Sequence, residues 1–265
     1  MGAKLFVDEL AKWVLRKIFE LDADLSVKDC CVGLKYSYVE VSGKKGDALG
    51  LALTPVEDIF GTRVGAPTPP SISRVEGMVS STNPIEKALG VALVNALSGY
   101  LMWNLGFKGD FALRSGEIVA SVPDLVKEPV VVVGNMVPLV RRLLERGYEV
   151  VGVLERRQSL RIAGALPDTM APRVVPKART VIITGATLVN DTIDQILSLA
   201  GDAVKILVGP TAAAHPTPLF TLGVSAVASM APVEVDRVKR VVRLGGGRWD
   251  FSKYSREYVA VPSGS

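Results

Sequence analysis

The chain has 265 residues, of which 48% are hydrophobic and 22% are charged. With a mean hydropathy of +0.31, it can bury enough apolar surface to offset the entropy cost of ordering, which excludes an intrinsically disordered protein. One histidine and two adjacent cysteines exclude clustered zinc sites and the disulfide frameworks of small secreted proteins. We therefore expect a globular protein of the reducing cytoplasm, with two domains or one large α/β domain.

The formal net charge of +4 is unevenly distributed along the chain. Residues 1–122 carry 13 Lys and Arg against 14 Asp and Glu, whereas residues 123–265 carry 18 against 13. Basic residues interleaved with aromatic ones, as on a nucleic-acid-binding surface, occur only near the C-terminus, around Trp249 and Tyr254. We therefore interpret the basic excess as solvated helix faces and expect no nucleic-acid partner.

The first half of the chain has the pattern of an α+β domain, which we place at residues 1–122. Apolar residues three and four positions apart in segment 5–21 predict an amphipathic helix. The alternating run Cys30–Val41 and the apolar run Leu49–Leu53, with a polar glycine turn between them, predict a β-hairpin. Asn83-Pro84-Ile85-Glu86 predicts a helix start, with an asparagine cap, a proline in the first turn and a glutamate that reaches back.

The segment from Ala88 to Phe107 is long enough to span a bilayer and contains no charged residue. Asn95, Ser98 and Asn104 dilute its apolar character, and no Lys/Arg cluster or aromatic belt marks both ends. The N-terminus also lacks the pattern of a signal peptide. We therefore predict a buried core helix here and no association with a membrane.

The second half, which we place at residues 123–265, alternates short apolar strands with helices. Parallel strands need crossovers that cover both faces of the sheet, so this pattern predicts a Rossmann-like, doubly wound domain with a mainly parallel sheet. Ligands on such sheets bind outside the carboxyl ends of the strands. The predicted strands are 130–133, 149–154, 180–184, 204–208 and 224–229, and the predicted helices include 190–200 and 235–242.

Candidate site residues lie in the loops at those carboxyl ends. Glycines permit close backbone approach, and amide and hydroxyl side chains at a helix start favour an anion. A turn with a helix cap explains any one loop equally well, but five loops that meet at one sheet edge favour a binding site. The candidates for ligand binding are Gly134, Asn135, Met136, Gly185, Thr187, Asn190, Thr192, Gly209 and Thr211, and the candidate catalytic residues are Glu155 and His215.

One pattern is compatible with nicotinamide binding. Gly134 follows a predicted strand, and Glu155 ends the next strand about 20 residues later, where a ribose-binding carboxylate would lie. The turn lacks the second and third glycines of a dinucleotide-binding loop, and Met136 stands where the backbone would approach a pyrophosphate. A nicotinamide-dependent oxidoreductase is therefore a secondary hypothesis, and Glu155 could instead bind another ligand or pair with Arg156 or Arg157.

Five motifs occur in order along nearly the whole chain. They are Asn83-Pro84 with Glu86 before the apolar run Ala88–Leu97, Gly134–Pro138 with Glu155, Gly185–Thr192, Gly209–Thr211, and Pro218–Phe220 before Gly223. Together they resemble the heavy-metal-chelation family of uncharacterised prokaryotic proteins. The resemblance implies an N-terminal domain similar to the enolase N-terminal domain, a C-terminal Rossmann-like domain, and an active site where the two meet.

Direct chelation of a soft metal would need paired thiolate or imidazole ligands, and Cys30, Cys31 and His215 have no such spacing. We therefore hypothesise an enzyme or binding protein whose small-molecule ligand, an anion or a metal chelator, lies in the interdomain cleft. Asn83 and Asn95 of the first domain would face the loops of the second. The alternatives are a non-catalytic carrier of a metal or metallo-ligand, and a homo-oligomer assembled through the tail 245–265. The sequence assigns no cofactor and no metal ligand.

Overall fold

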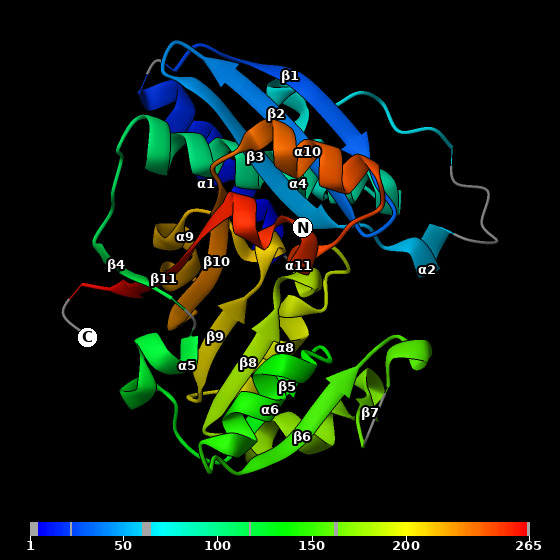
Figure 1. Cartoon of the computed structure of the whole chain (residues 1–265), viewed down its shortest axis with the longest axis vertical. Helices are drawn as coiled ribbons and strands as arrows, with labels where there is room; N and C mark the ends of the chain where they lie inside the picture. The colour runs from blue at the N-terminus through cyan, green and yellow to red at the C-terminus, as the bar shows by residue number, and fades with distance from the viewer. Residues whose placement is uncertain (1–4, 22, 60–64, 117, 162–163, 264–265) are drawn as a thin grey trace.

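The computed structural model describes residues 5–21, 23–59, 65–116, 118–161 and 164–263. It contains two β-sheets with helices between and around them (Figure 1). The smaller sheet has the strand order β1-β2-β3 and is antiparallel, and the larger has the order β4-β11-β10-β9-β8-β5-β6-β7 and is mostly parallel. The α/β class predicted from the sequence is therefore confirmed.

The small sheet consists of β1 (Leu25–Val32), β2 (Tyr36–Gly43) and β3 (Gly46–Leu53). The alternating pattern predicted one strand through Cys30–Val41, but the chain reverses direction at Gly33. A Cβ atom at Gly33 would lie 2.6 Å from the Tyr36 carbonyl oxygen and 2.7 Å from that of Val242. Only glycine fits this tight turn, so the predicted hairpin is β2–β3 and β1 is an additional strand.

Helices cover both faces of the small sheet (Figure 1). On one face, α4 (Pro84–Gly99) packs on β2 and β3, and α1 (Phe6–Glu20) and α3 (Val75–Val79) pack on α4. On the other face lies α10 (Val235–Arg243), which comes from the far end of the chain. The two halves of the sequence are thus interleaved in space.

The helix start predicted at Asn83 is present, since the Asn83 side chain accepts hydrogen bonds from the amides of Ile85 and Glu86 at 3.0 and 3.2 Å. The Glu86 carboxylate does not accept a hydrogen bond from the Asn83 amide as predicted, because it contacts Ser81 and Arg74 instead. A π-helical turn, η2 (Tyr100–Asn104), extends α4, so that Pro84–Asn104 forms one continuous helix. Within its most apolar window 83% of the residues are buried inside the protein, as expected for a core helix.

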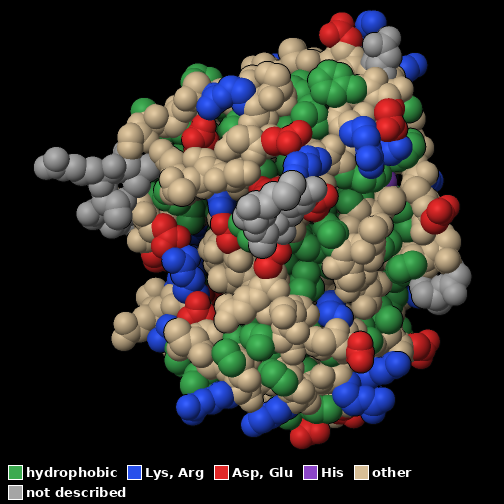
Figure 2. All heavy atoms as spheres, turned by 180° about the vertical axis from the view of Figure 1, so that it is seen from behind, with side chains coloured by type: hydrophobic (Ala, Val, Ile, Leu, Met, Phe, Trp, Pro, Cys, Tyr) green, Lys and Arg blue, Asp and Glu red, His purple; other side chains and the backbone are tan. Residues whose placement is uncertain are grey.

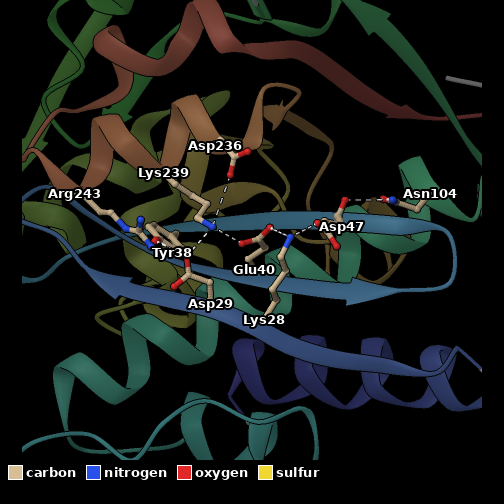
Figure 3. Close-up of polar contacts among 9 residues, drawn as sticks. All are labelled: Lys28, Asp29, Tyr38, Glu40, Asp47, Asn104, Asp236, Lys239 and Arg243. Carbon is tan, nitrogen blue, oxygen red and sulfur yellow. Dashed lines mark hydrogen bonds and ion pairs between the residues drawn. The ribbon is translucent and has the colours of Figure 1, made fainter.

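Ion pairs fasten α10 to the small sheet (Figure 3). The Lys239 ammonium lies 2.6 Å from a carboxylate oxygen of Glu40 on β2 and 2.7 Å from one of Asp29 on β1. Arg243, one turn further along α10, lies 2.6 Å from the same Asp29 oxygen. Glu40 is only 1% exposed, so this contact is part of the interior.

The large sheet is covered on both faces. The strands are β4 (Phe111–Ser115), β5 (Val130–Val133), β6 (Val150–Glu155), β7 (Leu166–Pro167), β8 (Thr180–Thr184), β9 (Val204–Val208), β10 (Ala226–Pro232) and β11 (Ser255–Pro262). On one face lie α5 (Ile118–Ser121) and α6 (Val137–Glu145), and on the other α7 (Ala171–Val174), α8 (Ile193–Ala200) and α9 (Pro216–Thr221). Side chains on both faces of β5 are therefore buried, which explains its uninterrupted valine run.

The strand order reverses between β5 and β8. From β5 the chain moves outward to β6 and β7, and then returns to the other side of β5 to form β8, β9 and β10. All these strands run parallel, whereas β11 pairs antiparallel with β10 and β4 at the remaining edge. The strand β11 of the C-terminal tail is therefore paired within its own chain on both sides, and β4 also joins the larger sheet although it precedes residue 122.

Short helical segments complete the fold. They include α2 (Val56–Ile59), η7 (Gly185–Leu188), η8 (Pro210–Ala212), α11 (Arg248–Phe251) and η9 (Ser252–Tyr254).

Candidate functional site

The loops after β5 and β8 lie side by side where the strand order reverses. Gly134, directly after β5, has φ +96°, and a Cβ there would lie 2.7 Å from a methyl group of Thr184 at the end of β8. The glycine therefore serves the packing of two neighbouring strand ends. The Met136 amide is hydrogen-bonded to the Gly134 carbonyl at 2.8 Å, and α6 begins immediately after it. This reversal point is where open parallel sheets bind ligands.

Glu155 ends β6 and ties two loops together. It is 9% exposed, and its two carboxylate oxygens accept hydrogen bonds from the Asn135 amide at 2.9 Å and the Arg157 amide at 2.8 Å. These bonds fix the loop after β5 against the loop after β6. The structure therefore gives Glu155 a positioning role toward Asn135, one of the predicted ligand-binding residues.

Three arginines follow Glu155, and the guanidinium groups of two of them form short ion pairs or hydrogen bonds. Arg156 makes a two-pronged ion pair with Asp58 of α2, at 2.6 and 2.8 Å. Arg161 donates to the carbonyls of Glu155 and Arg156 at 2.7 and 2.9 Å. Among the described residues, the Arg157 guanidinium makes only long ion contacts, 3.5 Å to Glu57 and 4.0 Å to Glu155, and it is the least closely paired of the three.

The loop after β8 is compact and mostly buried. A Cβ at Gly185 would lie 2.5 Å from the backbone nitrogen of Ala212 in η8, so this glycine permits contact with the next loop. The Thr187 hydroxyl donates to the Thr184 carbonyl at 2.8 Å. Asn190 accepts from the amide and hydroxyl of Thr192, at 3.2 and 2.7 Å, just before α8 begins. The side chains of Thr187, Asn190 and Thr192, which were predicted to bind a ligand, therefore form hydrogen bonds within their own loop.

The structure brings Asn95 and Thr211 together across the two halves. The Asn95 side-chain amide of α4 donates to the Thr211 carbonyl at 2.9 Å and to the Leu51 carbonyl of β3 at 2.8 Å. The Thr211 hydroxyl in turn accepts from the Leu53 amide at 2.9 Å. Gly209, which precedes this segment, has φ +102° and turns the chain out of β9. Both polar side chains are at most 3% exposed.

The contact around Asn95 has no room for a ligand. A cavity between α1, α3, α4 and the loops after β8 and β9 has a volume of about 10 Å³, roughly that of one water molecule. Its lining is Val7, Leu10, Val79, Val91, Val94, Asn95, Leu188 and Ala214. The cleft expected between the halves is therefore closed by apolar side chains at this point. Asn83 lies at the start of α4, where its side chain caps the helix and donates to the Gly65 carbonyl.

His215 is buried in an aromatic cage. Its ring centroid lies 4.6 Å from that of Trp13, 5.4 Å from that of Phe111 and 5.5 Å from that of Phe107. Burial lowers the pKa of His215 to about 4, although the Phe107 carbonyl opposes the shift. The ring is therefore neutral at pH 7, with Nδ1 accepting from the Thr217 amide at 3.4 Å and Nε2 facing the Phe107 carbonyl at 3.3 Å.

Glu155 and His215 come from strands that are not neighbours. Glu155 ends β6 and His215 follows β9, and β5 and β8 lie between these strands. At about 4.8 Å per strand spacing, the ends of β6 and β9 are roughly 14 Å apart.

Sequence reasoning missed a grouping of Tyr36 and Arg248 with Arg157. Tyr36 begins β2, pairs with Leu53, and has its ring 5.3 Å edge-on from Phe251 of α11. Burial raises the pKa of the Tyr36 phenol, while the positive charges of Arg248 and Arg157 oppose the shift. Because these residues come from three distant segments, no local pattern could have placed them together.

Metal ligands do not gather anywhere in the described residues, where no group of three His, Cys, Asp or Glu side chains could hold an ion. Cys30 is exposed and Cys31 half-buried on β1, and their side chains face opposite sides of the strand. On the back of the molecule acidic and basic side chains are interspersed (Figure 2).

Fold and site together define an α/β protein with a candidate site at the carboxyl edge of a mostly parallel sheet. Comparison with known sequences identifies its family. Two family models, both described as "Putative heavy-metal chelation", match residues 7–98 (DUF4213) and 118–261 (DUF364). The chain belongs to this family, as its motifs had indicated.

Known relatives agree over almost the whole chain. An uncharacterised protein of Methanocaldococcus jannaschii is 32% identical over 258 residues, 96% of this chain and 97% of the relative. The crystal structure of a protein of unknown function from Pyrococcus horikoshii covers 96% of this chain and 99% of its own, with 30% identity and a TM-score of 0.80. A protein from Desulfitobacterium hafniense, with 21% identity, 96% and 98% coverage and a TM-score of 0.70, shares the fold.

Proposed function

We propose that this protein binds a small organic anion at the edge of the large sheet where β5, β6 and β8 end. The observation that carries the proposal is the loosely paired Arg157 guanidinium beside the point where the strand order reverses. A positive group without a close partner favours an anionic ligand, and parallel sheets bind ligands at such a point.

The surroundings of Arg157 support this assignment. The start of α6 lies on the neighbouring loop, and helix N-termini favour negative charge. Glu155 holds the Asn135 backbone in place by accepting a hydrogen bond from its amide. The positive charges of Arg157 and Arg248 both act on the Tyr36 phenol, so a ligand at Arg157 would lie near residues of both halves of the chain.

The family description concerns heavy metals, and the described side chains favour an indirect link to them. Soft metal ions prefer clustered thiolates and imidazoles, and the described residues contain no cluster of three metal-binding groups. We therefore propose that a metal would reach this protein as a complex with an organic anion that itself supplies the metal ligands. A protein that merely carries such a complex is the alternative.

We also propose a division of the chain into two domains. The division into domains 1–122 and 123–265, similar to the enolase N-terminal domain and to Rossmann-like domains, is supported by the two family matches, which end at residue 98 and begin at residue 118. Free cysteines at positions 30 and 31 fit a cytoplasmic location.

Mass spectrometry of small molecules released from the purified protein tests the proposal. We expect an organic anion to co-purify with the wild type and to be lost from Arg157→Ala. Arg141→Ala, at an exposed arginine of α6, is the matched control and should retain it. Citrate, a chelating anion, should raise the melting temperature of the wild type more than that of Arg157→Ala.

Two results would contradict the proposal. One is that Arg157→Ala keeps the same ligand and the same citrate response as the wild type. The other is that neither a released anion nor a citrate response is found in the wild type. Stoichiometric metal in elemental analysis, without an organic ligand, would instead favour direct metal carriage.

A further inference from the structure

The outer side of α10 borders a groove that is separate from the loops at the sheet edge. It has a volume of about 460 Å³ and is lined by Asp236, Arg237, Arg240, Val241 and Tyr254. That volume lies within the range of small-molecule sites, roughly 300 to 1,000 Å³. None of its lining residues belongs to the loops after β5, β6, β8 or β9.

Helix geometry explains why this groove is basic. Val238, Lys239 and Val242 point inward to the small sheet and are at most 9% exposed. At 100° per residue, Arg237, Arg240 and Val241 must then lie on the other side of the helix. The inward-pointing Lys239 pairs with Glu40 and Asp29 of the small sheet. Arg237 and Arg240 point away from that sheet and therefore away from its carboxylates.

The cations of the groove differ in how strongly they are paired. The Arg237 guanidinium lies 2.9 Å from Glu234, with 63% of its side chain exposed. Arg240 forms no ion pair with any residue that the structure describes. Tyr254 lines the groove from η9, and its ring centroid lies 5.3 Å from the Arg237 guanidinium and 5.1 Å from the Lys253 ammonium. Their hydrogen bonds lower the pKa of the Tyr254 phenol, so its oxygen acts as an acceptor here.

We propose that this groove is a second binding site, which takes a small organic anion with an apolar or planar part. The anionic group would pair with Arg240 and Arg237, because guanidinium groups match the geometry of phosphates and carboxylates. The apolar part would lie on Val241 and the Tyr254 ring. Asp236, whose side chain is 98% exposed, opposes the anion and weakens binding.

Isothermal titration calorimetry with phenyl phosphate, benzoate and inorganic phosphate tests the proposal on the intact chain. We expect phenyl phosphate or benzoate to bind at one site, more tightly than inorganic phosphate, which lacks the ring. The better of the two identifies the anionic group as phosphate or carboxylate. Arg240→Ala should weaken binding about tenfold, since a charged hydrogen bond contributes about 1.5 kcal/mol or more.

Two further variants make the test decisive without unfolding the protein, because both positions are on the surface. Asp236→Asn removes the opposing charge and should tighten binding, whereas Arg141→Ala on α6 should leave it unchanged. Absence of binding at 5 mM phenyl phosphate and benzoate, on the order of the weakest useful affinities, would overturn the proposal. So would an unchanged affinity of Arg240→Ala, or a loss seen in Arg157→Ala instead, which would assign the anion to the sheet edge.

Discussion

Asn95 joins three segments with one side chain. Its amide group bridges the carbonyl of Leu51 on β3 and that of Thr211 in η8, both in the interior. An asparagine within an apolar helix looked like a candidate ligand-binding residue in the sequence. Its surroundings give it a structural role, since each buried carbonyl would otherwise lack a donor.

Asn95→Ala should destabilise the protein by about 2–4 kcal/mol, because it leaves two buried carbonyls without partners. Urea unfolding measures the change. Asn104→Ala is the matched control: Asn104 also donates to two carbonyls, those of Lys45 and Asp47, but near the surface. We expect the control to cost less than half as much, and equal losses would refute a special role for the buried bridge.

His215 links stability to pH. Its folded-state pKa of about 4 lies below the ordinary value of 6.5 because burial disfavours the charged ring. Between these values the unfolded chain binds a proton that the folded chain does not. Stability is therefore fully present above pH 6.5 and decreases as the pH falls toward 4, by up to about 3 kcal/mol at about 1.4 kcal/mol per pKa unit.

NMR titration of the single histidine, together with urea unfolding at pH 7 and pH 4.5, checks this prediction. His215→Gln should show a smaller loss of stability over the same range, because the titrating group is gone. An imidazole signal that titrates near pH 6.5 in the folded protein would contradict the aromatic cage as the cause.

At the scale of elements, the contact between β3 and α4 depends on Gly50. A Cβ at this position would lie 2.0 Å from the Ala92 carbonyl oxygen and 2.2 Å from the Ala96 nitrogen. These are backbone atoms of a helix, which cannot move aside without disturbing its hydrogen bonds. The absence of a side chain on β3 thus sets how closely the helix approaches the sheet.

Gly50→Ala should destabilise the fold by about 3 kcal/mol or more, as expected for overpacking against backbone. Gly77→Ala is the matched control, since Gly77 lies in α3 with no atom within 4 Å of the added methyl group. Alanine is the better helix former, so the control should gain up to about 1 kcal/mol. Thermal unfolding of both variants measures the difference, and a neutral Gly50→Ala would show that β3 and α4 separate easily.

At the scale of the whole molecule, α10 from the second half closes the small sheet of the first half. Lys239 meets Glu40 across 199 residues of sequence, and both are buried. Because each half covers a face of the other, we expect the chain to unfold in a single cooperative transition.

Lys239→Met should lower the free energy of unfolding by about 3 kcal/mol, since Glu40 would lose its buried partner. Glu40 retains Lys28 at 3.1 Å, which limits the loss. In the double variant Lys239→Met/Glu40→Gln the losses should not add, because the two residues form one interaction. Arg237→Met, on the outer side of the same helix, is the control and should change stability by less than about 0.5 kcal/mol.

Local patterns were sufficient for the class of fold. The valine run of β5, the asparagine cap of α4 and the glycine that ends α8 are signals between neighbouring residues, so they can be recognised without knowing the rest of the molecule. The motifs also carried the family resemblance. The turn at Gly33 was not predicted, and one of the two carbonyls that require glycine there, that of Val242, is distant in the sequence.

What the sequence by itself determined about this protein is an α/β fold with candidate loops at one edge of a mostly parallel sheet. Only the tertiary structure decided which loop residues take part in packing and local hydrogen bonds, as Thr187, Thr211 and His215 do, and which keep a loosely paired charge, as Arg157 does. The physical reason is that burial and charge pairing depend on segments far apart in the chain. Tyr36 of β2 meets Phe251 only because α10 and α11 fold back over the small sheet.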